Sequence, residues 1–442
     1  MCGRSISENA GVCLLAVAAA FGICCSGSRP DIEKARPDRD GGSVDGSPVE
    51  SAGSYDGGTR ADVDSLRGSG GEAPYDIEAR AVWVCRTSYN SPDDVRRIIS
   101  TAAGAGFNVV YFQVRGVADA YYHSSVEPWA AALTGKLGVD PGWDPLQTAI
   151  DTAHRAGIEL HAWINVCTAW KGRLPPGRSR PPHILRAHPE WRVAGPDGHS
   201  MPYSRGYVFM NPANPGFVKH IKAVVAELCS FYDLDGLHLD YARYPVAGTS
   251  RDRSSNRLYL RARRSNSSLT RAGWQRAMLT RLVASLRTEA HRIRPRLLVS
   301  AAVTGIYKDD WGWGRVTQGF SDFHQDSHAW AEQRAVDLLV PMIYWPPSSP
   351  PGMRADFLTL VEDFAPLSKD VGIIAGINVA AGDFTVLEEE IRIARSYAYT
   401  GVALFSYTLL DKRGWFSRLA KGPFKNKTFA REKTLAVVVR LP

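Results

Sequence analysis

The chain contains 442 residues, of which 44% have apolar side chains, and its formal net charge at pH 7 is +8. This composition is ordinary for a folded protein, and the length suits a single α/β barrel that carries insertions. The basic charge is uneven, because residues 251–281 and 412–442 each contain nine basic side chains and one acid. No nucleic-acid-binding module accompanies them, so we expect solvated loops, or contacts with anionic envelope polymers or lipid head groups, and no nucleic acid partner.

The first 28 residues indicate export. Arg4 precedes an apolar run over residues 11–23, which is too short for a comfortable membrane span and is typical of a secretory signal. Cys24 and Cys25 follow this run and resemble a bacterial lipoprotein cleavage site. We therefore expect lipidation at Cys24 or Cys25 and a membrane-anchored protein of the bacterial cell envelope, in the periplasm or at the cell surface. An uncleaved anchor and a soluble exported protein are the alternatives.

The rest of the chain divides by composition. Residues 29–76 contain Gly, Ser, Pro, Asp and Arg with almost no large apolar side chains, which predicts a flexible linker. We expect one folded barrel over residues 77–421 and a basic C-terminal tail over residues 422–442. Beyond the leader, Cys85, Cys167 and Cys229 are too few and too unevenly spaced for a disulfide framework or a zinc site.

Strand-like and helix-like segments alternate after residue 79, which predicts βα units around a parallel sheet. Eight strands are expected, the number that closes a (β/α)8 barrel. They cover residues 80–86, 107–115, 158–166, 234–240, 296–303, 336–345, 371–379 and 401–407. The connections over residues 116–144, 167–213 and 241–270 are long and follow strands. They should therefore build a substrate cleft on the carboxyl face of the barrel.

The fourth strand is too polar to be plain sheet core. His238 and Asp240 share one face of it and Leu237 and Leu239 the other, because strand side chains alternate. If the leucines pack outward, His238 and Asp240 point into the barrel mouth, where barrel enzymes keep their chemistry. A carboxylate so placed can act as a nucleophile or a general base. The structural alternative is a buried salt bridge to Arg243 or Arg115.

Other strand ends should converge on the same mouth. They supply hydrogen-bonding and aromatic groups together, a mixture that suits sugars, which present hydroxyl edges and apolar C–H faces. Each of these side chains has a core polar or packing function as its alternative. The expected substrate-binding residues are Gln113, Arg115, Trp163, Asn165, His238, Arg243, Tyr344, Trp345 and Asn378.

Glycoside hydrolysis normally requires two carboxyl groups, one to protonate the leaving oxygen and one as nucleophile or base. Asp240 is the first. For the acid we consider Glu127, whose pKa desolvation beside Trp129 would raise, and Asp310 in the loop after the fifth strand. Further candidates are Asp119, Asp309 and Asp383.

Ordered motifs along residues 78–420 resemble the bacterial glycosyl hydrolase-like 10 family. Among them are RAVW at 80–83, FNVVYFQVRG at 107–116, EPW at 127–129, PGWDPL at 141–146, GIELHAWIN at 157–165, HPEW at 188–191 and DGLHLDYARYP at 235–245. The resemblance implies a TIM-barrel glycosidase of the cell envelope, frequently a lipoprotein, acting on cell-wall glycan such as peptidoglycan. It also invites comparison with α-amylase-like barrels, but the fifth strand lacks the acid expected there.

Three hypotheses about the function follow from these features. The first is a glycoside hydrolase with a polysaccharide substrate, a lipid anchor in the membrane, no cofactor and a monomeric state. The second is a glycan-binding barrel that has lost catalysis. The third is a metal-dependent hydrolase that uses His161, His238 and Asp240, although the first strand lacks the paired His usual for such barrels.

Overall fold

The computed structural model describes residues 77–347, 355–397 and 399–430. The expected signal, linker and lipidation cysteines lie outside these residues, as does most of the expected tail. Within the described ranges, no helix combines the length and apolar character that a membrane span needs.

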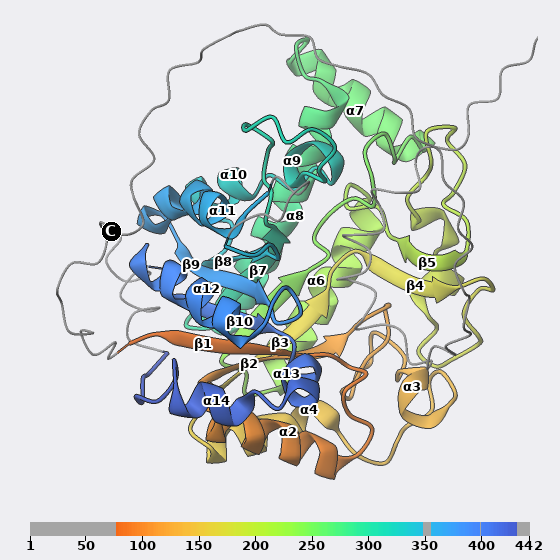
Figure 1. Ribbon diagram of the computed structural model, residues 1–442. Coiled ribbons are helices and arrows are strands. Elements are labelled where there is room, and N and C mark those ends of the chain that lie inside the picture. The colour runs from red at the N-terminus through yellow and green to blue at the C-terminus, as the bar shows by residue number, and fades with distance from the viewer. Residues whose placement is uncertain (1–76, 348–354, 398, 431–442) are drawn as a thin grey trace, which may run out of the picture.

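Eight parallel strands close into a barrel in the order β1-β10-β9-β8-β7-β6-β3-β2, which confirms the predicted fold (Figure 1). Each strand falls within or close to an expected segment. The strands are β1 (Ala79–Val84), β2 (Val109–Arg115), β3 (Glu159–Asn165), β6 (Gly236–Asp240), β7 (Leu298–Thr304), β8 (Leu338–Ile343), β9 (Gly372–Asn378) and β10 (Gly401–Phe405).

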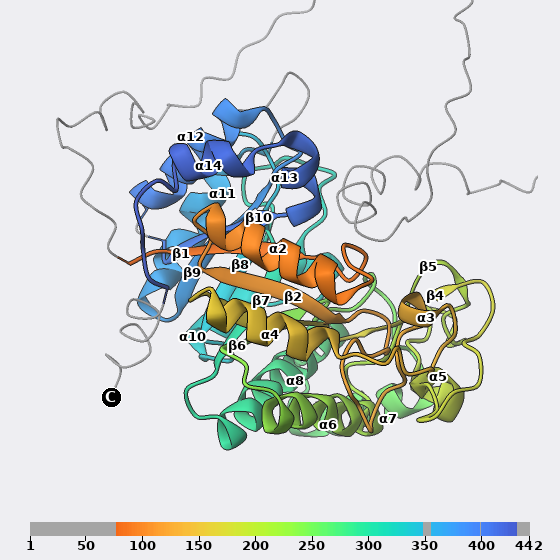
Figure 2. The ribbon, with the colours of Figure 1, turned by 90° about the horizontal axis from the view of Figure 1, so that it is seen from below.

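Helices surround the barrel, as the view from below shows (Figure 2). Several begin with a capping side chain and a proline: Ser91, Asp144 and Asn214 each accept backbone N–H groups of the first turn and are followed by proline. The helices are α2 (Pro92–Gly104), α3 (Ala131–Thr134), α4 (Pro145–Arg155), α5 (Ile184–Ala187), α6 (Pro215–Phe231), α7 (Arg253–Ser265), α8 (Arg271–Ile293), α9 (Gly319–Asp322), α10 (Ser327–Glu332), α11 (Phe357–Phe364), α12 (Phe384–Ser396), α13 (Tyr407–Arg413) and α14 (Phe416–Lys421). Short 3₁₀ turns cover Pro189–Trp191 and Ala365–Lys369.

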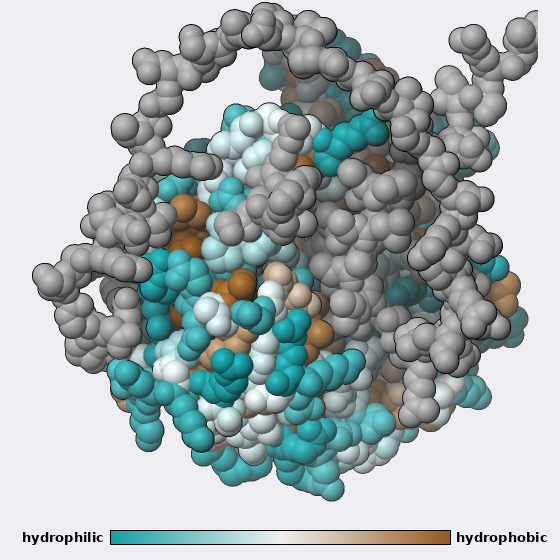
Figure 3. Space-filling view, in the orientation of Figure 1, coloured by the Kyte–Doolittle hydropathy of each residue, from teal (hydrophilic) through white to brown (hydrophobic). Residues whose placement is uncertain are grey.

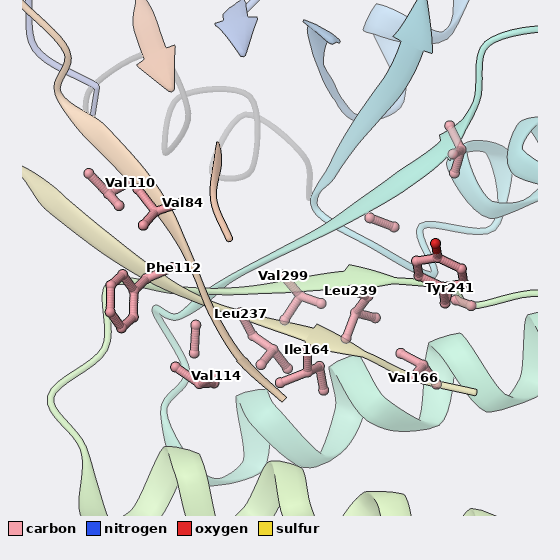
Figure 4. Close-up of a cluster of buried hydrophobic side chains, with 14 of the residues drawn as sticks. Val84, Val110, Phe112, Val114, Ile164, Val166, Leu237, Leu239, Tyr241 and Val299 are labelled. Carbon is pink, nitrogen blue, oxygen red and sulfur yellow. The ribbon is translucent and has the colours of Figure 1, made fainter. Parts of the chain in front are cut away.

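The core has two layers because side chains alternate along each strand. Leu237, Leu239 and Ile164 lie on the outer side of the barrel, toward the helices, as expected (Figure 4). The opposite parity fills the barrel interior with Trp83, Tyr111 and other buried side chains. Toward solvent, hydrophilic residues dominate the visible face over α2 and α14 (Figure 3).

All three long connections contain secondary structure of their own, and the connection after β2 contains the short helix α3. The connection after β3 forms an antiparallel pair, β4 (Thr168–Gly172) with β5 (Ser204–Phe209), which stands beside the barrel (Figure 1). The connection after β6 contains α7, in which only Ser255 is buried. Asn211, just after β5, donates to Asp252 and Ser255 at 3.0 and 2.7 Å and so ties the two insertions together.

Candidate active site

A pocket opens at the carboxyl ends of the barrel strands. Its cavity volume is about 20 Å³, and the space between its walls, counted out into the open mouth, is about 400 Å³. Eleven residues line it, six of them aromatic: Trp83, Gln113, Trp163, Asn165, Tyr207, Asp240, Tyr241, Ala302, Met342, Tyr344 and Phe405. Most come from strand ends, and Tyr207 comes from β5, so an insertion does contribute to the cleft.

Asp240, the last residue of β6, supplies the carboxyl group of this pocket. Its Oδ2 accepts the indole N–H of Trp163 at 3.2 Å, and its Oδ1 accepts the backbone N–H of Tyr241 at 2.6 Å. Burial raises the pKa of Asp240, while the charge of Arg243 and these two hydrogen bonds oppose the rise. Asp240 thus combines a desolvated carboxyl with donors that fix its orientation.

The backbone turns sharply after this carboxylate. Tyr241 has a φ of 48°, in the left-handed region that costs an ordinary residue roughly 1–2 kcal/mol. Its ring lines the pocket, and the Arg243 guanidinium lies over that ring at 4.5 Å from the centroid. Arg243 also stacks on Phe323 at 4.5 Å, so it acts on the pocket through Tyr241 and through its charge on Asp240.

The structure brings five of the predicted site residues together around this pocket: Gln113, Trp163, Asn165, Asp240 and Tyr344. The Gln113 amide donates to Oδ1 of Asn165 at 3.2 Å, and the Asn165 amide donates to the carbonyl of Gly116 at 3.2 Å. These contacts hold both amides at the pocket wall, where sugar hydroxyls would need donors and acceptors.

The expected raised pKa of Glu127 is wrong. Its carboxylate accepts two bonds from the Arg115 guanidinium at 2.7 and 2.8 Å and contacts His220 Nε2 at 2.9 Å. Burial pushes the pKa of Glu127 up, but the Arg115 charge and the hydrogen bonds from His220 and Arg115 outweigh it and lower the pKa to about 2. Glu127 is therefore an ionised partner of a buried arginine, which does not fit a group that must donate a proton.

Arg115 does not line the pocket either. It follows Gln113 by two residues, but the β2–β3 register shifts between them, so Arg115 does not share the pocket face with Gln113. The Arg115 guanidinium instead binds Glu127 and the backbone carbonyls of Asn165, Val166 and Thr168. It is a buried anchor that fastens the loop after β2 to the start of the β3 connection.

His238 lies inside the barrel but does not reach the pocket. Its Nε2 accepts the Trp83 indole N–H at 2.9 Å, and its Nδ1 lies 2.8 Å from the Ser300 hydroxyl. The ring also stacks on Tyr111 with centroids 4.0 Å apart. Burial holds the pKa of His238 well below its usual range, so it is a neutral packing and positioning residue rather than a sugar ligand.

The remaining predicted residues are placed at the periphery. Trp345 packs half-buried against the outer core, and Asn378 uses its Oδ1 to accept the backbone N–H of Ala380 at 3.0 Å. Neither is among the residues that line the pocket. Asp310 is exposed in the loop after β7.

The other candidate acids hold backbone turns. Asp119 accepts N–H groups of Gly116 and Val117, and Asp383 caps α12 by accepting from Thr385 and Val386. Asp309 accepts the N–H groups of Trp313 and Gly314 at 2.8 Å each. Among the candidates, and within the part of the chain that the structure describes, Asp310 is the one without such a contact.

Sequence reasoning missed six residues of the pocket lining: Trp83, Tyr207, Tyr241, Ala302, Met342 and Phe405. Strand parity could have found Trp83, the last inward-facing residue of β1, and also Ala302, Met342 and Phe405. Tyr241 and Tyr207 had no such signal, because Tyr241 depends on a left-handed turn and Tyr207 on where the β4–β5 pair lies beside the barrel.

The proposed metal ligands do not form a metal site. Within residues 77–347, 355–397 and 399–430, no group of three or more His, Cys, Asp or Glu side chains is arranged to hold a metal ion. Both ring nitrogens of His238 are engaged, and His161 Nε2 contacts Glu159 at 3.1 Å. The arrangement of His161, His238 and Asp240 therefore gives no support to the metal-dependent reading.

An eight-stranded parallel barrel with an aromatic pocket around a carboxyl at the strand ends places the chain in the class of (β/α)8 barrels with a site at the carboxyl face. The chain belongs to the Glycosyl hydrolase-like 10 family, whose model matches residues 78–381. This confirms the family resemblance seen in the sequence.

Similar proteins agree with this assignment. The chain is 29% identical over 258 residues to the glycosyl hydrolase DigH of Escherichia coli O6:H1, covering 54% of this chain and 55% of the relative. It is 27% identical over 294 residues to the glycosyl hydrolase YngK of Bacillus subtilis, covering 62% and 55%. The chain thus spans about half the length of these curated relatives. The catalytic domain of a β-amylase from Paenibacillus polymyxa shares the fold, with a TM-score of 0.55 and 12% identity over 80% of this chain and all of that one.

Proposed function

We propose that this protein hydrolyses O-glycosidic bonds of a cell-envelope polysaccharide, with peptidoglycan glycan strands as the substrate. The observation that carries the proposal is the buried carboxyl of Asp240 within a pocket of six aromatic residues. Flat rings fit the C–H faces of a sugar, and the amides of Gln113 and Asn165 fit its hydroxyl edges. The membership of the Glycosyl hydrolase-like 10 family supports the same reaction class.

Hydrolysis adds water across the glycosidic bond, so that the leaving oxygen gains a proton and the anomeric carbon gains a hydroxyl group. The raised pKa of Asp240 favours a group that gives or takes this proton over a permanently ionised nucleophile. We assign the second carboxyl to Asp310 by elimination, because Glu127, Asp119, Asp309 and Asp383 are all committed to structural contacts.

The test uses the purified full-length chain with glycan strands of peptidoglycan, with and without their stem peptides, and mass spectrometry of the products. New reducing ends should appear with the parent and fall by at least about 100-fold in Asp240→Asn and in Asp310→Asn. Full activity in Asp240→Asn would remove this residue from the reaction. Full activity in Asp310→Asn would remove only the second assignment.

One observation favours a second function, a glycan-binding barrel without catalysis. Asp240 is the single carboxyl among the residues that line the pocket in the described part of the chain. This alternative would be established if glycan strands bind to the parent protein but no reducing ends are released. The incubations should be long and should cover pH 4 to 8.

The export proposal rests on the N-terminal sequence. Lipidation at Cys24 or Cys25 would place the barrel beside envelope glycan at the end of the segment 29–76. Cys24→Ala and Cys25→Ala should be compared by cell fractionation and by intact mass. Loss of the lipid mass and of membrane association in one variant identifies the modified residue, and an unmodified parent contradicts the proposal.

A further inference from the structure

The loop between β7 and α9, residues 305–318, presents a stacked pair of tryptophans. The rings of Trp311 and Trp313 lie 4.5 Å apart between centroids, with 25° between their planes. Trp313 is half-buried and packs against the outer hydrophobic core, whereas Trp311 is 39% exposed. The core therefore holds one ring, and that ring supports a second whose surface is open to solvent.

Specific contacts fix the conformation of this loop. The Asp309 carboxylate accepts the backbone N–H groups of Trp313 and Gly314, both at 2.8 Å, and these bonds lower the pKa of Asp309. The backbone N–H of Asp309 donates to Oε1 of Gln318 at 3.0 Å, which ties the two sides of the loop. Gly312 and Gly314 have φ angles of 70° and 86°, a region that favours glycine. The loop is thus built to hold its tryptophans before any ligand arrives.

The loop begins at the same end of the barrel as the pocket. β7 pairs directly with β6, with Leu239 opposite Ala301, and Ala302 of β7 lines the pocket around Asp240. The Trp311–Trp313 pair itself does not line the pocket. It is a separate aromatic surface on a neighbouring loop of the carboxyl face.

We propose that the Trp311–Trp313 pair is an outer subsite that binds a pyranose ring of a linear oligosaccharide whose neighbouring units occupy the pocket at Asp240. The inference rests on the proposed function and adds a site to it. A rigid aromatic surface matches the C–H face of a sugar ring at little entropic cost. A polar side chain stands near it in sequence: the Lys308 ammonium lies over Tyr307 and Phe320 at 4.9 and 4.2 Å. This ammonium offers a donor for the hydroxyl edges.

An outer subsite has a length-dependent signature. It strengthens binding of strands long enough to reach it and leaves a disaccharide unaffected, because a short ligand occupies the pocket alone. We expect Trp311→Ala to weaken binding of long strands by about 3- to 10-fold and Trp311→Tyr to retain most of the affinity. Phe429→Ala provides a matched control, since Phe429 is 72% exposed beside Gly157 and Asp235, which precede β3 and β6 at the opposite end of the barrel.

Binding is measured by calorimetry on the full-length chain, with peptidoglycan strands freed of stem peptides and fractionated from the disaccharide upward. Each variant is combined with Asp240→Asn to suppress turnover. The subsite is overturned if Trp311→Ala and its parent bind long glycan strands with equal affinity. It is also overturned if Trp311→Ala loses as much affinity for the disaccharide as for long strands, or if the parent binds no glycan. Cleavage by the unmodified chain is assayed separately, so binding without cleavage rejects the proposed hydrolysis and leaves the subsite standing.

Discussion

The indole N–H of Trp83 donates to Nε2 of His238 at 2.9 Å, and this bond joins the pocket to the barrel interior. Trp83 lines the pocket, while His238 is fully buried and contacts Ser300 through its other nitrogen at 2.8 Å. Because burial lowers the pKa of His238, the ring is neutral, so Nε2 accepts and Nδ1–H donates. A polar chain across three strands thus fixes one wall of the pocket.

Replacement of this histidine by an apolar residue should destabilise the barrel. His238→Leu removes the acceptor of the Trp83 indole and the partner of the Ser300 hydroxyl, and an unpaired buried polar group costs about 1–3 kcal/mol. We expect the free energy of unfolding in urea at pH 7 to fall by roughly 2–5 kcal/mol. Ser300→Ala breaks only one of the two bonds and should cost less. A His238→Leu protein as stable as the parent would contradict this account of the network.

Glu127 should prove essential to folding stability and not to the chemical step. Glu127→Gln leaves the Arg115 charge in the interior without its counter-ion, and breaking such a pair costs about 3–5 kcal/mol. Asp93→Asn is the matched control, because its ion pair with Arg96 is exposed and should contribute less than about 1 kcal/mol. Urea unfolding measures both. A Glu127→Gln protein of normal stability that has lost hydrolysis would instead restore Glu127 as the acid.

The barrel could be predicted from the sequence because its signals are local. The strands are short runs rich in apolar residues, and eight such runs in alternation with helices leave one common architecture. The position of Asp240 followed from parity alone, since Leu237 and Leu239 had to face the helices. These inferences needed no knowledge of contacts between distant segments.

The electrostatics of the site could not be predicted in this way. The pKa of Glu127 depends on Arg115, 12 residues away, and on His220, 93 residues away. Trp129, the near neighbour on which the prediction relied, does not decide it. The separation of Gln113 from Arg115 results from a register shift that strict alternation does not anticipate. Tyr207 lies more than 40 residues after β3 and reaches the pocket only because β5 pairs with β4 beside the barrel.

The Trp163 indole should tune the proton affinity of Asp240. Its hydrogen bond favours the ionised carboxylate and so lowers the pKa of Asp240 against the effect of burial. Trp163→Phe removes the donor and keeps an aromatic ring, so the pKa of Asp240 should rise. The limb of the kcat/KM–pH profile that reports Asp240 should then move to higher pH, whether the residue acts as acid or base.

Trp170→Phe is the control for this substitution. The Trp170 indole donates to the carbonyl of Leu174 at 2.8 Å, and the residue does not line the pocket, so its profile should match that of the parent. A Trp163→Phe protein that loses rate without any movement of the limb would show that the indole only packs against substrate.

His324 should make the fold sensitive to acid. The residue is 3% exposed, both ring nitrogens lack a hydrogen-bond partner among the described residues, and burial with the nearby Arg276 charge lowers its pKa to about 4. Above pH 6.5 both the folded and unfolded forms are neutral at this site. As the pH falls from about 6.5 to 4, only the unfolded chain takes up the proton, so stability drops by up to about 1.4 kcal/mol per pH unit.

His324→Asn should reduce this acid sensitivity. Asparagine does not titrate and tolerates the φ of 53° found at position 324. Urea unfolding of the parent and the variant at pH 7.5, 6.0 and 5.0 gives the loss of stability in each, and all other titrating groups contribute equally to both. The variant should lose less stability between pH 6.0 and 5.0 than the parent does. Equal losses would mean that His324 takes up its proton in the folded protein as readily as in the unfolded chain, through an opening of its buried site.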